Sequence, residues 1–252
     1  MNILDLFSLQ HKRALVTGGN SGIGFAIAEA LAAAGAHVII VGRNQDKVTQ
    51  SVAAIKQASG ACDGISADLI QPDFDLADFA NQAGLIDIVV NAAGVNLRQP
   101  TEAITSESWD TTLNINLKIP FFLSRAFVPH MQQQKWGRII NIASLQTSRA
   151  FTNGLAYGAS KGGVGQLTRA MAEAWSGAGI MVNAIAPGFF RTPLTQPLYE
   201  HPDIVAELAG KTAVGRNGEP SDLHGIALFL ASRASDYVTG QVIYLDGGFT
   251  AK

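Results

Sequence analysis

The sequence predicts an α/β fold in which one doubly wound parallel sheet of seven strands carries helices on both faces. The chain has 252 residues and no Pro/Ser-rich or charged linker, so we expect a single domain over residues 1–252. Hydrophobic residues make up 47% of the chain and charged residues only 15%, which suits a sheet buried on both faces. Short apolar runs also alternate with longer helical stretches, the pattern of successive β-α units.

Composition excludes several classes of function. The formal net charge is -2 and the chain has no basic run, which argues against nucleic acid or an anionic membrane as the main partner. No apolar run approaches the roughly 20 residues that span a bilayer, and residues 1–12 lack the apolar core of a signal peptide. The single Cys62 excludes an internal disulfide and forms no metal cluster. We therefore expect a cytoplasmic protein that acts on a small molecule without a metal.

The first predicted strand, residues 13–17, runs directly into a glycine-rich turn and then into an Ala-rich helix over residues 25–34. Glycines in this position allow a tight turn, and they let backbone amides approach a phosphate at the helix N-terminus. The flanking strand and helix make the pattern much more specific than glycines alone. It predicts a dinucleotide site, with these candidates for cofactor contact: Gly18, Asn20, Ser21, Gly22, Ile23 and Gly24.

The end of the second predicted strand, residues 36–41, bears on which dinucleotide is preferred. An acidic residue about 20 positions beyond the glycines usually binds the ribose hydroxyls, whereas an arginine there suits a 2′-phosphate. This chain has Gly42 followed by Arg43, so we predict a preference for NADP(H), with NAD(H) as the alternative cofactor. The competing interpretation is a solvated Arg43 at a strand end.

Two more strand ends extend the predicted cofactor site. A helix over residues 45–58 precedes a strand over 62–67, and a short helix over 75–83 precedes a strand over 86–90. The small and polar residues that follow these strands are candidates for flanking the adenine and for contact with the cofactor: Asp68, Leu69, Asn91, Ala92, Ala93 and Gly94.

The strongest chemical signal is the pair Tyr157 and Lys161. Residues four apart in a helix share one face, so the phenol and the ammonium can occupy one site. A phenol with a pKa of about 10 is a poor acid or base at neutral pH. A cation about 4 Å away at an effective dielectric of about 20 supplies roughly the 4 kcal/mol needed to correct this. Tyr157 is therefore a candidate general acid and base tuned by Lys161, the alternative being a solvated surface pair.

Together these motifs resemble the short-chain dehydrogenases/reductases, whose fold is Rossmann-like. The resemblance rests on residues 17–24 and 91–94, on Tyr157 with Lys161, and on Pro187-Gly188, and in this order it covers nearly the whole chain. One departure is Ala92, where the family usually repeats the asparagine. A small residue is tolerable there.

The resemblance implies a role for each matched residue. It makes Asn116, Ser144, Tyr157 and Lys161 the catalytic residues, with Asn116 holding a water that links the lysine to solvent and Ser144 orienting the substrate carbonyl. Tyr157 and Lys161 also contact the cofactor, the lysine through the nicotinamide ribose. The turn after the sixth strand is expected to hold the nicotinamide, through these residues: Pro187, Gly188, Phe190 and Thr192.

The remaining pattern completes the fold. An apolar helical stretch over 107–131, interrupted by Pro120, precedes a strand over 138–143. Many glycines and alanines in a helix over 156–176 indicate a closely packed neighbour, and the resemblance favours a homotetramer. Later elements are expected at these ranges: a strand at 180–186, a mobile substrate lid around 190–212, a helix from 220 to 231 and a strand at 241–245.

The substrate is suggested by three segments, residues 5–9, 191–195 and 234–240, which look most like gluconate 5-dehydrogenases and related sugar-acid dehydrogenases. Such substrates carry a carboxylate, for which arginine is the natural bidentate partner. Arg98 is the first candidate and Arg149 the second. Gln146 and Asn153 are candidates for contact with the polyol.

Two other functions stay open at this point. A 3-oxoacyl carrier-protein reductase shares the same motifs, but the stretch 193–212 carries three acidic residues against only Lys211, which disfavours an acidic carrier. A dinucleotide-binding regulator without activity would not need the four catalytic residues.

Overall fold

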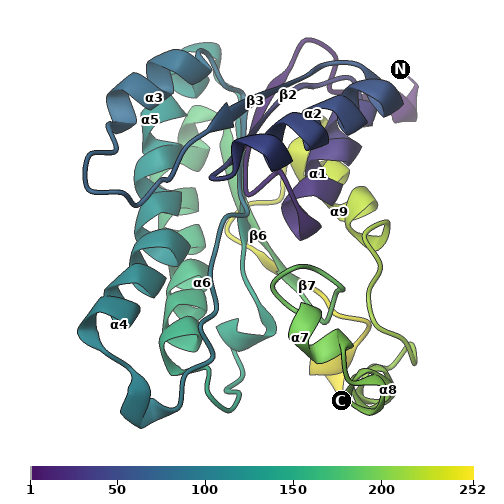
Figure 1. Cartoon of the computed structure of the whole chain (residues 1–252). Helices are drawn as coiled ribbons and strands as arrows, with labels where there is room; N and C mark the ends of the chain where they lie inside the picture. Colours follow the sequence, from purple (N-terminus) through teal and green to yellow (C-terminus); the bar gives the residue numbers. More distant parts are fainter. Residues whose placement is uncertain (1) are drawn as a thin grey trace.

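The computed structural model describes residues 2–252 and contains one sheet of seven parallel strands, as predicted. The strand order is β3-β2-β1-β4-β5-β6-β7 (Figure 1). The strands have these bounds: β1 Arg13–Thr17, β2 His37–Gly42, β3 Cys62–Ser66, β4 Ile88–Asn91, β5 Gly137–Ile142, β6 Ile180–Pro187 and β7 Val242–Leu245. The order changes direction at β1, because β2 pairs on one side of it and β4 on the other. A ligand crevice is expected where the chain leaves the ends of these two strands.

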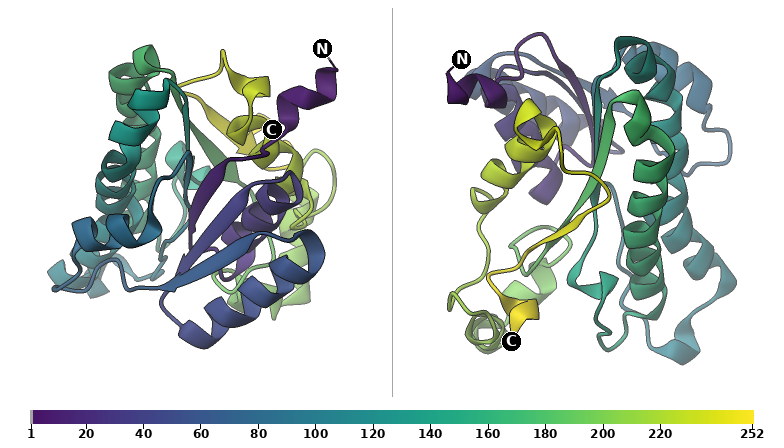
Figure 2. Two further views of the ribbon diagram at one scale, coloured as in Figure 1. Left: turned by 90° about the horizontal axis from the view of Figure 1, so that it is seen from above. Right: turned by 180° about the vertical axis from the view of Figure 1, so that it is seen from behind.

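Helices cover both faces of the sheet. Those longer than one turn have these bounds: α1 Gly22–Ala33, α2 Gln45–Ser59, α3 Leu76–Ala83, α4 Ser106–Leu113, α5 Ile119–Gln134, α6 Leu155–Trp175, α8 Pro202–Lys211 and α9 Asp222–Ala231. Helices α1, α2 and α9 lie on one face, and α3, α5 and α6 lie on the other (Figures 1 and 2). In β1, Ala14 and Val16 pack toward the first face and Leu15 toward the second. This alternation explains why the strand is apolar throughout.

The predicted helix over 107–131 is two helices. Between α4 and α5, residues Asn114–Lys118 form a π-helical turn, and the Ile119 amide donates to the Asn114 carbonyl. Pro120 follows directly and has no N–H, so it cannot donate the α-helical hydrogen bond to the carbonyl of Asn116. The interruption therefore lies at a predicted site residue.

The first helix begins earlier than predicted, at Gly22 within the glycine-rich turn. Gly18 and Gly22 have positive φ angles of 65° and 52°, which only glycine adopts without strain. Gly24 is needed for another reason, since a Cβ there would lie 2.4 Å from the Gly18 carbonyl oxygen. The absence of that Cβ lets the helix approach the end of β1.

In the region that the structure describes, none of the helices is both long enough and apolar enough to cross a membrane.

We predict opposite effects for two Gly→Ala substitutions within helices. Gly24→Ala forces α1 away from the Gly18 carbonyl. The free energy of unfolding of this variant should be about 1–3 kcal/mol lower than that of the wild type, the usual effect of overpacking. In Gly225→Ala, in α9, the added Cβ meets no atom within 4 Å. This substitution should raise the free energy of unfolding by about 0.5–1 kcal/mol through helix propensity. Urea unfolding measures both, and similar values for the two variants would contradict the close approach at Gly24.

Candidate active site

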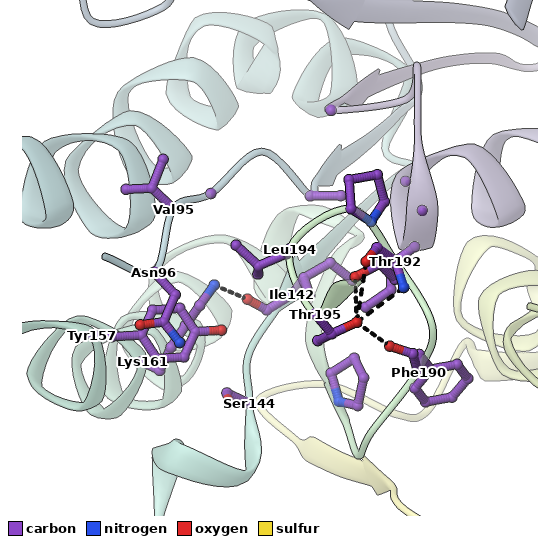
Figure 3. Close-up of a pocket in the computed structure, with 18 of the residues that line it drawn as sticks. Val95, Asn96, Ile142, Ser144, Tyr157, Lys161, Phe190, Thr192, Leu194 and Thr195 are labelled. Carbon is purple, nitrogen blue, oxygen red and sulfur yellow. Dashed lines mark hydrogen bonds between the residues drawn. The ribbon is translucent and has the colours of Figure 1, made fainter. Parts of the chain in front are cut away.

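A cavity of about 550 Å³ lies where β1, β4, β5 and β6 end (Figure 3). Most of the predicted site residues line it: Gly18, Ser21, Gly22, Ile23, Gly24, Arg43, Ala92, Ala93, Gly94, Arg98, Ser144, Gln146, Tyr157, Lys161, Pro187, Gly188, Phe190 and Thr192. Because the carboxyl ends of parallel strands share one edge of the sheet, residues spread over the sequence from 18 to 192 meet in one place.

The glycine-rich turn is joined to the end of β4 by Thr17. Its hydroxyl donates to the Val90 carbonyl at 3.4 Å and accepts from the amides of Ala92 and Ala93, each at 3.1 Å. A Cβ on Gly18 would come within 3.0 Å of the Ala93 amide. The two loops therefore pack backbone against backbone, and the groove between them is open to a dinucleotide, consistent with the proposed role of these residues.

Asn116 lies in the π-helical turn and is almost fully buried. Its Oδ1 accepts from the Val95 amide at 2.9 Å, and its Nδ2 donates to the Val95 carbonyl at 2.9 Å and to Ser160 Oγ at 3.0 Å. The side chain thus joins the segment after β4 to α6. The predicted water would have to bind the backbone carbonyl, which Pro120 leaves without its α-helical donor, so that role stays a prediction.

Lys161 is buried, with an exposed fraction of 5%, and its ammonium donates to the Ile142 carbonyl at 2.6 Å (Figure 3). Burial lowers its pKa from 10.5 to about 8, because the charged form loses water. Its Nζ lies 5.6 Å from the centre of the Tyr157 ring, so the predicted pair forms.

Tyr157 is tuned differently from the expectation. Burial raises the pKa of its phenol, and the opposing effects come from a hydrogen bond with Ser144 and from the positive charge of Arg98. From the sequence we expect Lys161 to lower this pKa, whereas the lowering comes from Ser144 and Arg98. In the structure the ammonium points to the Ile142 carbonyl, and the phenol is partly buried in the cavity wall.

The cavity is electropositive. Three cationic side chains line it, Arg43, Arg98 and Lys161, and no Asp or Glu does so among the described residues. Within the part of the chain that the structure describes, no cluster of His, Cys, Asp or Glu could hold a metal ion either. Such a lining favours ligands with several negative charges, as phosphates and carboxylates supply.

Several predicted residues lie outside the lining. Asn20 backs Gly42, whose Cβ would lie 2.4 Å from Asn20 Oδ1. Asp68 accepts from the Ile70 amide at 3.3 Å, Leu69 is buried, and Asn153 is exposed with a φ of 57°. Contact between a bound adenine and Asp68 or Leu69 stays a prediction.

Asn91 and Arg149 are directed elsewhere by clear hydrogen bonds. The Asn91 amide donates to Asn141 Oδ1 at 2.8 Å and Ser124 Oγ at 3.0 Å inside the protein, so it supports the site from behind. The Arg149 guanidinium donates to the carbonyls of Thr250 at 3.2 Å and Lys252 at 3.0 Å.

Part of the lining was not predicted from the sequence: Val95, Asn96, Leu97, Ile142, Ala143, Leu145 and Phe151. The first three directly continue the predicted 91–94 segment, which is a signal that could have found them. Phe151 lies in an irregular loop, and nothing in its local pattern marks it.

Fold and site together are those of a dinucleotide-dependent oxidoreductase. Residues 18–250 match a family model described as "Enoyl-(Acyl carrier protein) reductase". The chain belongs to the short-chain dehydrogenase/reductase family.

Within this family, the chain is similar to several dehydrogenases of sugar acids. The chain is 37% identical to a gluconate 5-dehydrogenase of Gluconobacter oxydans, covering 98% of this chain and 97% of that protein. It is 41% identical to a 2-dehydro-3-deoxy-D-gluconate 5-dehydrogenase of Escherichia coli, covering 99% of this chain and all of that protein. Among solved structures, a gluconate 5-dehydrogenase from Burkholderia cenocepacia in complex with NADP and tartrate superposes with a TM-score of 0.92 at 37% identity, covering 99% of both chains.

We predict that Lys161→Met stabilises the protein at neutral pH. The native lysine has a pKa of about 8 and the unfolded one about 10.5, so between these values unfolding takes up protons and wild-type stability rises with pH. Below pH 8 the full penalty of burying the ammonium is present. Replacing the lysine removes this penalty but also removes the hydrogen bond to Ile142. The net effect should be a rise of about 1–2 kcal/mol in the free energy of unfolding at pH 7.

Urea unfolding at pH 7 and pH 10 tests this, with Lys47→Met, an exposed lysine, as the matched control. The advantage of Lys161→Met over the wild type should shrink at pH 10. If Lys161→Met is less stable than the wild type by the same amount at both pH values, burial of the ammonium does not lower the stability of the wild type.

Proposed function

We propose that the protein is an NADP(H)-dependent dehydrogenase that interconverts a secondary alcohol and a ketone on a sugar acid such as gluconate or 5-ketogluconate. The observation that carries this proposal is the cavity lining, in which Ser144 and Tyr157 share one cavity with three cations and no described carboxylate. The similar proteins named above act, by their names, at C5 of gluconate or of its 2-dehydro-3-deoxy derivative.

The residues that hold the cofactor follow from the lining. The glycine-rich turn and Arg43 suit the phosphates, the 92–94 segment suits the extended body of the dinucleotide, and the turn at Pro187-Gly188 suits the nicotinamide. When bound, the dinucleotide supplies the hydride acceptor for oxidation and the donor for reduction.

The chain's own residues then handle the proton and the substrate oxygen. The Ser144 hydroxyl, which forms a hydrogen bond with the Tyr157 phenol, has a single proton and donates it to the substrate oxygen when a substrate is bound. In oxidation Tyr157, as phenolate, takes the hydroxyl proton; in reduction it returns that proton to the carbonyl oxygen. The hydrogen bond with Ser144 and the charge of Arg98 oppose the effect of burial on the phenol pKa and so favour the phenolate, while Lys161, 5.6 Å from the centre of the ring, contacts the nicotinamide ribose.

Arg98 is the proposed partner of the substrate carboxylate. It lines the cavity close enough to Tyr157 for its charge to lower the phenol pKa, and its backbone has a φ of 51°, a conformation uncommon outside glycine. Strain of this kind clusters at functional sites, where it aims a side chain.

We expect Arg98→Ala to raise KM for gluconate about 10–100-fold, the usual effect of losing a charge-assisted hydrogen bond in a desolvated site. Arg98→Lys should give an intermediate value, because the charge remains and the bidentate geometry is lost. Steady-state kinetics over gluconate, 5-ketogluconate, 2-dehydro-3-deoxygluconate and an acetoacetyl thioester measure this and test the proposed function. Tyr157→Phe is the control that should bind NADPH without turnover.

Turnover of the thioester alone, with no sugar acid accepted, would overturn the substrate proposal. An unchanged KM for gluconate in Arg98→Ala would remove Arg98 from it.

Two features support the preference for NADP(H). Arg43 lines the cavity, and at position 42 the Asn20 side chain occupies the space that any side chain larger than that of glycine would need. We predict that Arg43→Ala weakens NADPH binding about 10–100-fold and leaves NADH binding nearly unchanged, because only NADPH carries the 2′-phosphate. Fluorescence titration of both cofactors measures the ratio. Tighter binding of NADH than NADPH by the wild type would contradict the assignment.

A 3-oxoacyl carrier-protein reductase is the alternative that one observation favours, the apolar wall formed by Leu97, Phe151, Phe189 and Leu194. Its difficulty is the charge of residues 193–212, where Glu207 pairs with Lys211, the only lysine or arginine of that stretch. An acidic carrier would meet little unpaired positive charge there.

Two structural proposals accompany the function. Residues 190–212 act as a lid, since Thr192 contacts the glycine-rich turn at Gly22 and Leu194 lines the cavity. The chain also assembles as a homotetramer. An apolar groove along Leu117, Phe121 and Leu167, between the π-helical turn, α5 and α6, supports this assembly.

A further inference from the structure

The last residues of the chain reach the substrate half of the cavity. Phe249 is nearly buried, and its ring centre lies 6.3 Å from that of Phe151 and 5.6 Å from that of Phe189. Phe151 and Phe189 are 6.3 Å apart and both line the cavity, whereas Phe249 lies behind them. The three rings therefore form one cluster from three distant parts of the sequence.

Polar contacts fix this terminal segment, residues 249–252, on three sides. Arg149 donates to the Thr250 and Lys252 carbonyls, and its guanidinium lies 5.8 Å from the centre of the Phe249 ring. Thr250 donates to Asp246 from its amide at 2.9 Å and its hydroxyl at 2.7 Å. The Lys252 ammonium donates to the Thr212 carbonyl, just after α8, at 2.9 Å. Figure 2 shows this end of the chain beside α8.

The cluster supports parts of the wall that lie in loops. Phe151 belongs to the irregular stretch between β5 and α6, and Phe189 to the turn after β6. Aromatic pairs at these distances stabilise each other beyond simple burial, so loss of Phe249 removes support from both rings at once.

We propose that residues 249–252 are a positioning element of the substrate site, with Phe249 setting the aromatic wall and Arg149 clamping the segment. This inference rests on the proposed function in one respect: the wall is taken to pack against the C–H face of a polyhydroxy acid whose carboxylate binds Arg98. Arg149 acts through the terminal segment and is not a carboxylate ligand.

Kinetics of Phe249→Ala, Phe249→Leu and Arg149→Ala test the proposal. We expect KM for the accepted substrate to rise about tenfold in Phe249→Ala and about threefold in Arg149→Ala, with kcat within twofold and the Kd for NADPH unchanged. Phe249→Leu, which keeps most of the volume, should fall between wild type and Phe249→Ala. Phe74→Ala is the matched control. The ring centres of Phe74 and Phe79 are 5.5 Å apart, and neither residue lines the cavity.

The double variant Arg149→Ala/Phe249→Ala distinguishes a clamp from a ligand. Its KM should be no higher than that of Phe249→Ala, because both substitutions release the same segment. Multiplied effects, or an Arg149→Ala defect confined to carboxylate substrates, would overturn the clamp.

Hydrogen exchange of the NADP-loaded protein gives a readout that needs no turnover. Amides in 148–154 and 188–195 should exchange faster in Phe249→Ala and Arg149→Ala, and not in Phe74→Ala. If no sugar acid is turned over but this pattern appears, the proposed substrate fails and the positioning role stands. Unchanged exchange in both variants would overturn the positioning role whatever the substrate is.

Discussion

A buried cation is the constraint on which the site depends. Lys161 is held by one short hydrogen bond to the carbonyl of Ile142, at the end of β5. That bond fixes α6 against the edge of the sheet, and Tyr157, one turn earlier on the same helix, is fixed with it. Water is excluded from the ammonium, so its pKa is only about 8 and the charge is kept at neutral pH at the expense of stability. Stability is lowered locally where the chemistry needs a charge without water.

Neutral polar side chains hold the surroundings of that cation. Asn116 binds both backbone groups of Val95 and the hydroxyl of Ser160, whose own proton goes to the Tyr157 carbonyl at 2.7 Å. Gly94 makes the arrangement fit, because a Cβ there would lie 2.9 Å from Asn116 Oδ1. The segment after β4, the π-helical turn and α6 are thus joined without a second charge.

The sequence predicted those features that depend on neighbouring residues along the chain. Most strands are short apolar runs, and Gly18, Ser144 and Pro187 each lie at or just after the end of a strand, so the shared edge of a parallel sheet was enough to bring them together. Side-chain direction was not available in this way. Asn91 ends a strand as predicted, yet its amide turns inward to Asn141, and Arg149 turns to the terminal segment. The tuning of Tyr157 was missed because burial and the charge of Arg98, a residue 59 positions away in the sequence, both depend on tertiary structure.

Arg98 links substrate binding to proton transfer under the proposed function. Its charge lowers the pKa of the Tyr157 phenol while the cavity is free of substrate. A carboxylate paired with the guanidinium compensates that charge, so the phenol holds its proton more tightly once a sugar acid is bound. The same side chain that selects an anionic substrate therefore moves the phenol toward the form that donates a proton in ketone reduction. Burial, the hydrogen bond with Ser144 and the charge of Arg98 set the proton affinity of Tyr157, and of these only the charge of Arg98 is open to compensation by the substrate.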